Sequence, residues 1–329
     1  MRTLRVHDAD SGQSLYKFLS RYMKLAPKSF LYKMLRKKNI VLNGKKAEGD
    51  EILKESDSVR LFLSDDTIEK FRRKVSVYME KEGNELNIIY ENEHIIFINK
   101  PAGVLSQKSK KEDVSLVDHL EMYLNRKGSY VPDAEHGFSP GLCNRLDRNT
   151  SGILAAGRTW KGLRMMSELL REHKVRRYYL CIVSGKMEKE ITLKGYLHKE
   201  ERHNKVSVFS GNMGEDKPID TKEIITKIEP IGFHCGYSMI RAELITGKSH
   251  QIRAHLSSIG HPIIGDYKYG RTSVNQAVKN EFGIRSQMLH SYEMVFDEVP
   301  PLLKDLQYQT FRAPYPAVFD TVMGKEKEQ

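Results

Sequence analysis

The sequence has few cysteines and no long apolar run. Its three cysteines, Cys143, Cys181 and Cys235, are odd in number and far apart in the chain, so they provide neither a disulfide framework nor a CxxC metal site. No run of about 18 apolar residues occurs, which excludes a membrane-spanning helix. The opening residues lack the apolar block of a secretory signal. We therefore expect a cytoplasmic protein with reduced thiols and no membrane contact.

The sequence also lacks internal repeats and low-complexity tracts. Its 329 residues, at ~150 residues per domain, favour about two domains. Apolar residues make up 39% of the chain and charged residues 29%, which is too apolar for wholesale disorder. The net charge of +11 favours a polyanionic partner. We expect a monomer, and the sequence itself leaves the oligomeric state open.

Acidic residues are missing between Ser11 and Ala47, where ten basic residues occur. Such a stretch repels itself unless something anionic lies against it. Ser14 can cap a first helix, whose apolar residues recur at helical spacing, and Pro27 suits the first turn of a second helix. A strand from Ile40 into an Asn-Gly turn follows, and residues 59–63 predict a closing strand.

Two short helices with a basic face and a small β element suit RNA binding. This segment resembles an S4 RNA-binding domain through the stretches LRKK (35–38) and VLNGK (41–45). We assign residues 1–65 to an S4-like α/β domain and residues 66–84, which are rich in charge, to a linker. The alternative is a solvated basic face on an accessory helical module.

From residue 85 the pattern changes to clustered strands with irregularly placed helices. Apolar runs predict strands near residues 86–90, 94–98, 153–156, 178–183 and 237–245, and helices near 117–124, 163–174 and 249–258. This order favours an α+β domain on a mixed, mainly antiparallel sheet over a repeated βαβ unit. We assign residues 85–320 to this domain and residues 321–329 to a charged tail.

The segment NRLDRNTSG (144–152) precedes one predicted strand and places Asp147 between Arg145 and Arg148. Neighbouring cations favour the ionised form of a carboxylate, and an ionised, positioned Asp can act as nucleophile or general base. The alternative is an Asp in a structural turn, neutralised by the adjacent arginines.

The segment TGKSHQIRAHL (246–256) follows another predicted strand. Ser249 is expected to cap a helix whose free N–H groups, with Lys248, offer a phosphate site. His250 and Arg253 then share one helix face. A zinc site is excluded because two histidines five residues apart do not share a face, and a P-loop is excluded because Ala242 stands where its first glycine is required.

Together these segments resemble the RluA-type family of RNA pseudouridine synthases. The resemblance also includes KPAG (100–103), RYY (177–179), GHPIIGD (260–266) and LH (289–290), in the family's order. It implies a pseudouridine synthase fold and the isomerisation of uridine to pseudouridine in RNA, without cofactor or metal. The S4-like module favours large-subunit (23S) ribosomal RNA over transfer RNA as the substrate.

The resemblance also implies roles for individual residues. Asp147 matches the catalytic carboxylate, Arg253 is expected to pair with it, and Tyr179 is expected to stack on the uracil and help remove the C5 proton. The family usually has His where this chain has Asn144, and Lys is common where it has Arg177. We expect RNA contacts from the following basic residues: Arg145, Arg148, Lys248, His250, Lys33, Arg36, Lys37 and Lys38.

Two other functions compete with this one. A non-catalytic RNA-binding assembly factor could keep the fold, but an intact Asp147 with Arg253 and Tyr179 favours an enzyme. A glycoside-type hydrolase would need a second carboxylate within roughly 5–9.5 Å of Asp147. The nearest candidate in the motifs is Asp266, which we interpret as structural.

Overall fold

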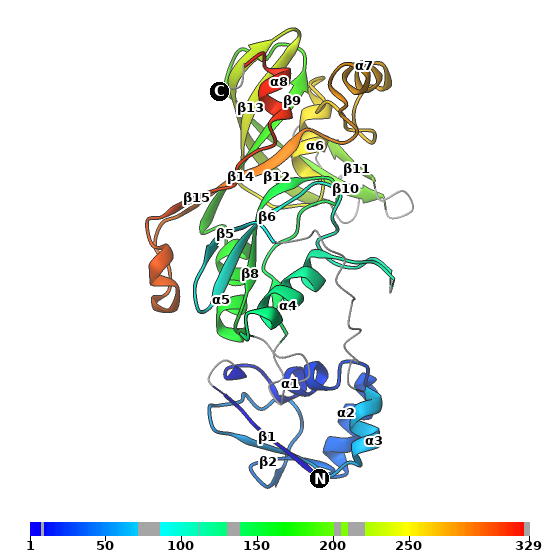
Figure 1. Ribbon diagram of the computed structural model, residues 1–329, viewed down its shortest axis with the longest axis vertical. Coiled ribbons are helices and arrows are strands. Elements are labelled where there is room, and N and C mark those ends of the chain that lie inside the picture. The colour runs from blue at the N-terminus through cyan, green and yellow to red at the C-terminus, as the bar shows by residue number, and fades with distance from the viewer. Residues whose placement is uncertain are drawn as a thin grey trace.

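The computed structural model describes residues 1–7, 10–71, 86–110, 112–129, 139–200, 205–209 and 221–325. These residues form two parts, an N-terminal module (residues 1–71) and a larger part (from residue 86), each with its own sheet (Figure 1). Most of the expected linker, residues 72–84, lies outside the described residues, as do residues 326–329 of the expected tail.

The N-terminal module combines three helices with a four-stranded antiparallel sheet in the order β1-β4-β2-β3. Its elements are β1 (Arg2–Arg5), α1 (Leu15–Tyr22), α2 (Lys28–Arg36), β2 (Ile40–Leu42), β3 (Lys45–Lys46), β4 (Ser58–Leu61) and α3 (Asp65–Phe71). The two predicted helices and the strands at residues 40 and 59 are confirmed. The short strand β1 was not predicted, because it pairs only with the distant β4.

Local sequence explains the helices of this module. The Ser14 side chain accepts a hydrogen bond from the backbone N–H of Lys17 and caps α1, as predicted. Pro27 is the N-cap of α2 and not part of its first turn. The apolar stripes of both helices are buried in one core, where each large side chain contributes about 1.5–3 kcal/mol. The basic residues in the last turn of α2 and directly after it are exposed: Lys33, Arg36, Lys37 and Lys38.

The larger part is built on one eleven-stranded sheet. Its strands are β5 (Ile88–Glu91), β6 (Ile95–Lys100), β7 (Gly141–Leu142), β8 (Ser151–Gly157), β9 (Val175–Ser184), β10 (Ile191–Glu200), β11 (Lys205–Phe209), β12 (Lys222–His234), β13 (Tyr237–Leu244), β14 (Leu289–Phe296) and β15 (Thr310–Arg312). The main order is β11-β10-β12-β13-β9-β14-β8-β6-β5. Only β8 and β14 pair in parallel among the described strands. The predicted α+β class and mainly antiparallel sheet are confirmed.

Helices cover both faces of the central strands. The helical elements are α4 (Leu116–Arg126), α5 (Trp160–Arg171), α6 (Gln251–Ser258), α7 (Thr272–Phe282), the 3-10 helix η3 (Pro301–Leu306) and α8 (Val318–Val322). On β8, Leu154 belongs to the core that includes residues of α4, α6, α7 and α8, while the next residue, Ala155, belongs to the core that includes residues of α5 and η3. Because neighbouring strand residues point to opposite faces, burial on both faces explains why β8 is a continuous apolar run.

Gly152 lets the start of β8 approach β14 closely. Its φ is +109°, and a Cβ atom built there would lie 2.1 Å from the carbonyl oxygen of Ser291. Only glycine adopts this conformation without strain and without a clash. The segment that carries Asp147 therefore enters the sheet at a fixed position.

The N-terminal module contacts the larger part through α1 and α5. The Arg21 guanidinium lies 3.8 Å from the centroid of the Trp160 ring, a favourable cation–π arrangement. Arg164 donates from Nη1 to the carbonyl oxygen of Gly12 at 3.2 Å. These contacts hold the basic module beside the larger part, and no helix among the described residues is long and apolar enough to cross a membrane.

Candidate active site

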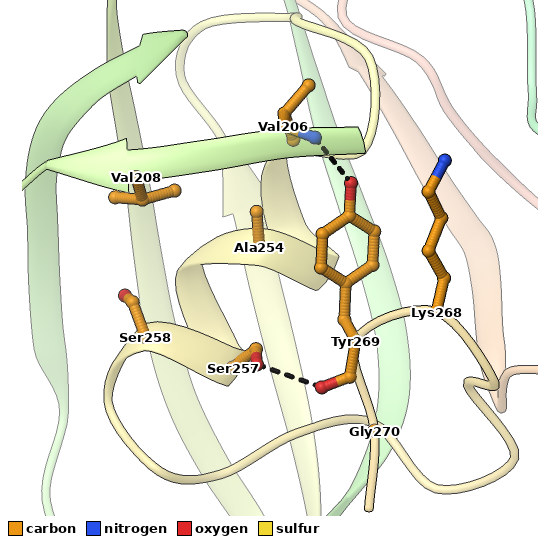
Figure 2. Close-up of a pocket in the computed structure, with 8 residues that line it drawn as sticks. All are labelled: Val206, Val208, Ala254, Ser257, Ser258, Lys268, Tyr269 and Gly270. Carbon is orange, nitrogen blue, oxygen red and sulfur yellow. Dashed lines mark hydrogen bonds between the residues drawn. The ribbon is translucent and has the colours of Figure 1, made fainter. Parts of the chain in front are cut away.

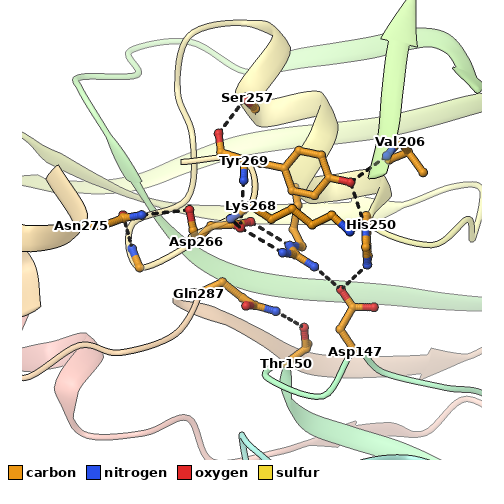
Figure 3. Close-up of polar contacts among 12 residues, drawn as sticks. Asp147, Thr150, Val206, His250, Ser257, Asp266, Lys268, Tyr269, Asn275 and Gln287 are labelled. Atoms are coloured by element: carbon orange, nitrogen blue, oxygen red, sulfur yellow. Dashed lines mark hydrogen bonds and ion pairs between the residues drawn. The ribbon is translucent and has the colours of Figure 1, made fainter. Parts of the chain in front are cut away.

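Asp147 and Arg253 form an ion pair. Asp147 lies in a polar cluster with His250, Tyr269 and Asp266 (Figure 3). Arg253 donates from Nη1 to Oδ2 of Asp147 at 2.7 Å, which confirms the predicted pairing. The Asp147 side chain is 28% exposed, whereas that of Arg253 is 8% exposed. The carboxylate is therefore accessible from solvent while its cationic partner is fixed within the protein.

Asp266 holds the other edge of the Arg253 guanidinium. Nε donates to Oδ2 at 2.7 Å and Nη2 donates to Oδ1 at 2.9 Å, a two-point contact that fixes the plane of the group. Burial lowers the pKa of Arg253, but the hydrogen bonds and charges of Asp266 and Asp147 outweigh it and raise the pKa overall. Burial raises the pKa of Asp266, but Arg253 and two backbone N–H groups lower it overall. Asp266 has the structural position predicted for it.

His250 approaches Asp147 from the side opposite its contact with Tyr269. Its Nε2 lies 3.7 Å from Oδ2 of Asp147, and its Nδ1 lies 2.9 Å from the Tyr269 hydroxyl oxygen. That oxygen accepts a hydrogen bond from the Val206 N–H of β11 at 3.0 Å, so the hydroxyl hydrogen can be donated to Nδ1. Burial lowers the pKa of His250. A neutral imidazole with its hydrogen on Nε2, directed at Asp147, fits these contacts.

The start of α6 differs from the prediction. Ser249 is exposed and does not cap the helix; the N-cap is His250, whose φ is +58° and whose side chain makes no capping bond. The Gln251 side chain secures the turn instead, since its Oε1 accepts from the Lys248 N–H and from the Thr246 hydroxyl. The left-handed backbone at His250 places its ring beside Asp147. The prediction failed because Ser is a good local cap, whereas the Gln251 contacts involve the distant β12.

Lys100 fixes the loop that carries Asp147. Its side chain is buried, and Nζ donates to the carbonyl oxygens of Pro101, Val104 and Arg148 at 2.9–3.0 Å. Burial lowers the pKa of Lys100 to about 8, against the opposing effect of Asp147. The sequence marked KPAG only through the family resemblance, because hydrogen bonds from a lysine to backbone carbonyls, one of them 48 residues away at Arg148, leave no pattern in the residues.

Asn144, which stands where His is usual, has a structural contact. Its Oδ1 accepts a hydrogen bond from the Ala155 N–H of β8 at 3.0 Å. An amide oxygen serves this purpose as well as a ring nitrogen would, so the departure from the family pattern leaves the loop anchored.

Tyr179 lies on β9 and is 6% exposed. Burial raises the pKa of its phenol, with a smaller raising effect from Asp147. Arg145 and Arg148 are exposed, and Arg148 donates from Nε to the Gly103 carbonyl oxygen.

The other predicted RNA contacts fall into two places. Lys248 is exposed beside the Asp147 cluster, two residues before His250. The basic residues of α2 belong to the N-terminal module and not to this cluster (Figure 1). The structure therefore brings together Asp147, His250 and Arg253, with Tyr179 and Lys248 near them. Tyr269 was not predicted, since its role depends on a turn between α6 and α7.

A cavity of about 300 Å³ adjoins this cluster between α6 and β11 (Figure 2). Tyr269 separates the cavity from His250, and its backbone oxygen accepts a hydrogen bond from Ser257. The remaining walls mix short apolar and polar side chains, which are Val206, Val208, Ala254, Ser258 and Lys268. Within the described ranges, no group of three or more His, Cys, Asp or Glu residues is arranged to hold a metal ion.

Comparison with known sequences matches this chain to pseudouridine-forming enzymes. A family model described as RNA pseudouridylate synthase matches residues 94–258. A Haemophilus ducreyi protein named ribosomal large subunit pseudouridine synthase C is 29% identical over 327 residues, covering 97% of this chain and 94% of its own. The Escherichia coli K12 protein of the same name is 29% identical over 295 residues, covering 87% and 86%.

Solved structures agree on the fold. Human RNA pseudouridylate synthase domain containing 4 is similar with a TM-score of 0.57 and 19% identity, covering 72% of this chain and 92% of its own. Human RNA pseudouridylate synthase domain containing 1 has a TM-score of 0.52 and 20% identity over the same shares. The N-terminal module lies outside the residues that the family model matches.

Proposed function

This chain belongs to the RNA pseudouridylate synthase family, and from that premise we propose that it converts uridine to pseudouridine in large-subunit (23S) ribosomal RNA with Asp147 as its catalytic carboxylate. Family membership makes the protein an isomerase that acts on RNA. The observation that carries the assignment of Asp147 is its geometry: a solvent-accessible carboxylate paired at 2.7 Å with a cation that is itself fixed by Asp266.

The reaction needs no other reactant. The bond between N1 of uracil and C1′ of ribose breaks, the base rotates, C5 bonds to C1′, and the C5 proton is lost while N1 gains one. Asp147 can attack C1′ or assist departure of the uracil, and both roles require an ionised, oriented carboxylate. Arg253 orients the carboxylate through its charge-assisted hydrogen bond.

Two further residues complete the proposed chemistry. We propose that the phenol of Tyr179 stacks against the uracil and helps to remove the C5 proton. The His250 Nε2–H directs a second donor toward the carboxylate. Because both side chains are largely buried, their positions are set before RNA binds, which lowers the cost of organising the site.

The target base must leave the RNA stack to reach Asp147, at a cost of a few kcal/mol. Cationic contacts to phosphates offset that cost. We propose that the N-terminal module is an S4-like RNA-binding domain that supplies many of them from α2, where Lys33, Arg36 and Lys37 are exposed. Its contact with α5 through Arg21 and Trp160 keeps this surface close to the catalytic part.

The proposal of ribosomal RNA as the substrate rests on the names of the relatives. Two relatives that span nearly the whole chain are called large-subunit enzymes, and this favours ribosomal RNA. Transfer RNA is the alternative, and a non-catalytic assembly factor is a further one, although an accessible Asp147 paired with Arg253 disfavours it.

Pseudouridine mapping of total RNA, with and without the gene, tests the proposal. We expect one or more large-subunit sites to disappear on deletion and to return with the wild-type gene. Loss of a pseudouridine in transfer RNA on deletion would show that transfer RNA is the substrate instead. An unchanged map, with the protein expressed in the parent strain, would contradict the proposed function.

A further inference from the structure

Arg177 is a buried cation without an anionic partner. Its residue exposure is 8%, it lies on β9 two positions before Tyr179, and both side chains point to the same face of the strand. Its Nε is buried without a hydrogen-bond partner. Within the described residues no carboxylate lies in ion-pair distance of its guanidinium; nearby Glu172 is paired with Arg171 and Lys174.

An unpaired guanidinium in this position is unfavourable in the protein alone. Removing a charge from water costs free energy that must be returned by a partner of opposite sign. Arg253, the other buried arginine beside the site, has two carboxylates. Arg177 has none, so its partner is expected to arrive with the substrate.

A second cation, Lys248, follows Gly247, whose backbone lies against the Arg177 guanidinium. Burial lowers the pKa of His173, and Arg177 and Lys248 lower it further, so both cations lie close to this imidazole. Lys248 is exposed and, like Arg177, makes no ion pair within the described part of the chain. Two cationic side chains, Arg177 on β9 and Lys248 in the loop before α6, thus belong to neighbouring segments, and neither pairs with a carboxylate within the described residues.

Gly247 makes room for the Arg177 guanidinium. A Cβ atom built at Gly247 would lie 3.1 Å from Nη2 and 3.2 Å from Nη1 of Arg177. These distances are shorter than ordinary contacts, so the guanidinium lies against the bare backbone of the loop. A side chain at residue 247 would crowd the group and displace it.

We propose that Arg177 and Lys248, with Gly247 beneath the guanidinium, bind a backbone phosphodiester of the RNA next to the target uridine. The proposal rests on the proposed function, since it requires RNA in this site. A guanidinium fork matches two phosphate oxygens, and the lysine supplies a second charge. Arg177 and Tyr179 lie two residues apart on the same face of β9, so a phosphate held here belongs to a nucleotide adjacent to the one whose base reaches Asp147.

The test pairs protein variants with RNA in which one phosphate is neutral. A short RNA that contains the mapped uridine is made with a methylphosphonate at the 5′ or the 3′ linkage of that nucleotide. Affinity is measured by titration, and pseudouridine formation by tritium release from C5. We expect one of the two methylphosphonates to weaken RNA binding by the wild type about tenfold, because a charge-assisted hydrogen bond is lost. The same methylphosphonate should change the affinity of Arg177→Met for RNA less than twofold.

Arg176→Met is the matched control. Arg176 is the neighbouring arginine on the opposite face of β9 and pairs with exposed Asp297. We expect its variant to bind natural RNA like the wild type and to keep the full penalty of the methylphosphonate. Equal penalties in wild type, Arg177→Met and Arg176→Met at both linkages would overturn the proposal.

Stability gives a second, independent measurement. If Arg177 serves an absent anion, Arg177→Met removes an unpaired buried charge and should unfold at the same temperature as the wild type or higher. A structurally paired arginine would destabilise the fold when replaced, and a clear loss of stability would contradict our interpretation. Arg177→Lys should recover part of the affinity for natural RNA.

Other outcomes separate this inference from the proposed function. If wild type forms no pseudouridine on any RNA, the proposed function fails. If it forms pseudouridine but shows no coupling between Arg177 and either linkage, only the phosphate subsite fails. Stabilisation of the wild type, but not of Arg177→Met, by inorganic phosphate without any coupling to RNA would assign the site to a free anion and would also overturn the proposal.

Discussion

Asp147 and Arg253 are 106 residues apart in the chain, and 2.7 Å separates Oδ2 of the first from Nη1 of the second. Asp147 comes from the loop before β8, and Arg253 comes from the first turn of α6. Asp266 binds the opposite edge of the same guanidinium through two hydrogen bonds. One cation therefore joins an accessible carboxylate to a buried one, and only the accessible one can meet a substrate.

Asp266→Asn should impair both activity and stability. An amide has only one acceptor oxygen, so the variant side chain cannot accept from Nε and Nη2 of Arg253 at two separate atoms. The guanidinium then loses its fixed plane and a buried ion pair is broken, at a cost of about 3 kcal/mol in the free energy of unfolding. We expect the rate of pseudouridine formation with saturating RNA to fall about tenfold, since the lost positioning is comparable to one charge-assisted hydrogen bond. Urea unfolding and single-turnover rates provide the two measurements.

Asp297→Asn is the control for that experiment, because Asp297 pairs with Arg176 at the surface. Exposed pairs contribute about 0–1 kcal/mol, so this variant should resemble the wild type. A fully active Asp266→Asn enzyme would show that Arg253 needs no support from residue 266.

Tyr269→Phe should change which ring nitrogen of His250 carries the hydrogen. The variant loses the hydroxyl that contacts His250 Nδ1 and accepts from Val206, at about 1 kcal/mol of stability. We expect ¹⁵N NMR of the wild type to show a neutral His250 ring with its hydrogen on Nε2, and the variant to show a mixture of tautomers with a several-fold lower rate. Tyr267→Phe, at an exposed position, should leave both unchanged. Identical His250 spectra in the wild type and Tyr269→Phe would refute this contact.

Neutralising the exposed face of α2 should weaken RNA binding without changing the chemical step. The variant has Gln in place of Lys33, Arg36 and Lys37. We expect it to have a higher Kd for RNA and a slope of log Kd against log salt that is smaller by about 2, because each phosphate contact with single-stranded RNA contributes ~0.7 to the slope. The rate with saturating RNA should stay close to that of the wild type. A Kd and a salt slope equal to those of the parent would exclude α2 from the RNA interface.

Mild acid should destabilise the fold through two buried histidines. Burial lowers the pKa values of His255 and His290 to about 4, from an ordinary value of 6.5. Between these values the unfolded chain binds protons that the folded chain does not, so the free energy of unfolding falls as the pH decreases from about 6.5 toward 4. The slope is on the order of 1 kcal/mol per pH unit for each group.

Urea unfolding at several values between pH 6.5 and 5 measures this effect. His290→Asn, if folded at pH 7 by circular dichroism, should show a flatter dependence because one titrating group is gone. Stability that stays constant over this interval in the wild type would contradict the assignment of neutral, buried imidazoles.

The sequence predicted the class of the fold better than its connections. Period-2 and period-3.6 patterns located most strands and helices, and their irregular order favoured an α+β sheet. The order of the eleven strands depends on long-range pairing such as that of β8 with β14, which no local pattern encodes. The start of α6 was misplaced for a related reason, since Gln251 is held by contacts with β12.

In the site, too, some features could be predicted from the sequence and others could not. Spacing alone left Asp147 open to a structural interpretation, and the family resemblance selected it and paired it with Arg253. The support from Lys100 and Tyr269 could not be predicted, because both act through backbone groups of distant segments. Arg177 was noticed as a charge, but its burial without an acid became visible only in three dimensions.

Asp147→Asn tests the central claim most directly. The amide keeps the size of the side chain, so the fold and the affinity for RNA should stay close to those of the wild type, while pseudouridine formation should fall below detection. The measurement is single-turnover tritium release from C5 at a saturating concentration of the variant, with Kd measured in parallel. Pseudouridine formation at the parent rate by the folded Asp147→Asn protein would contradict the account.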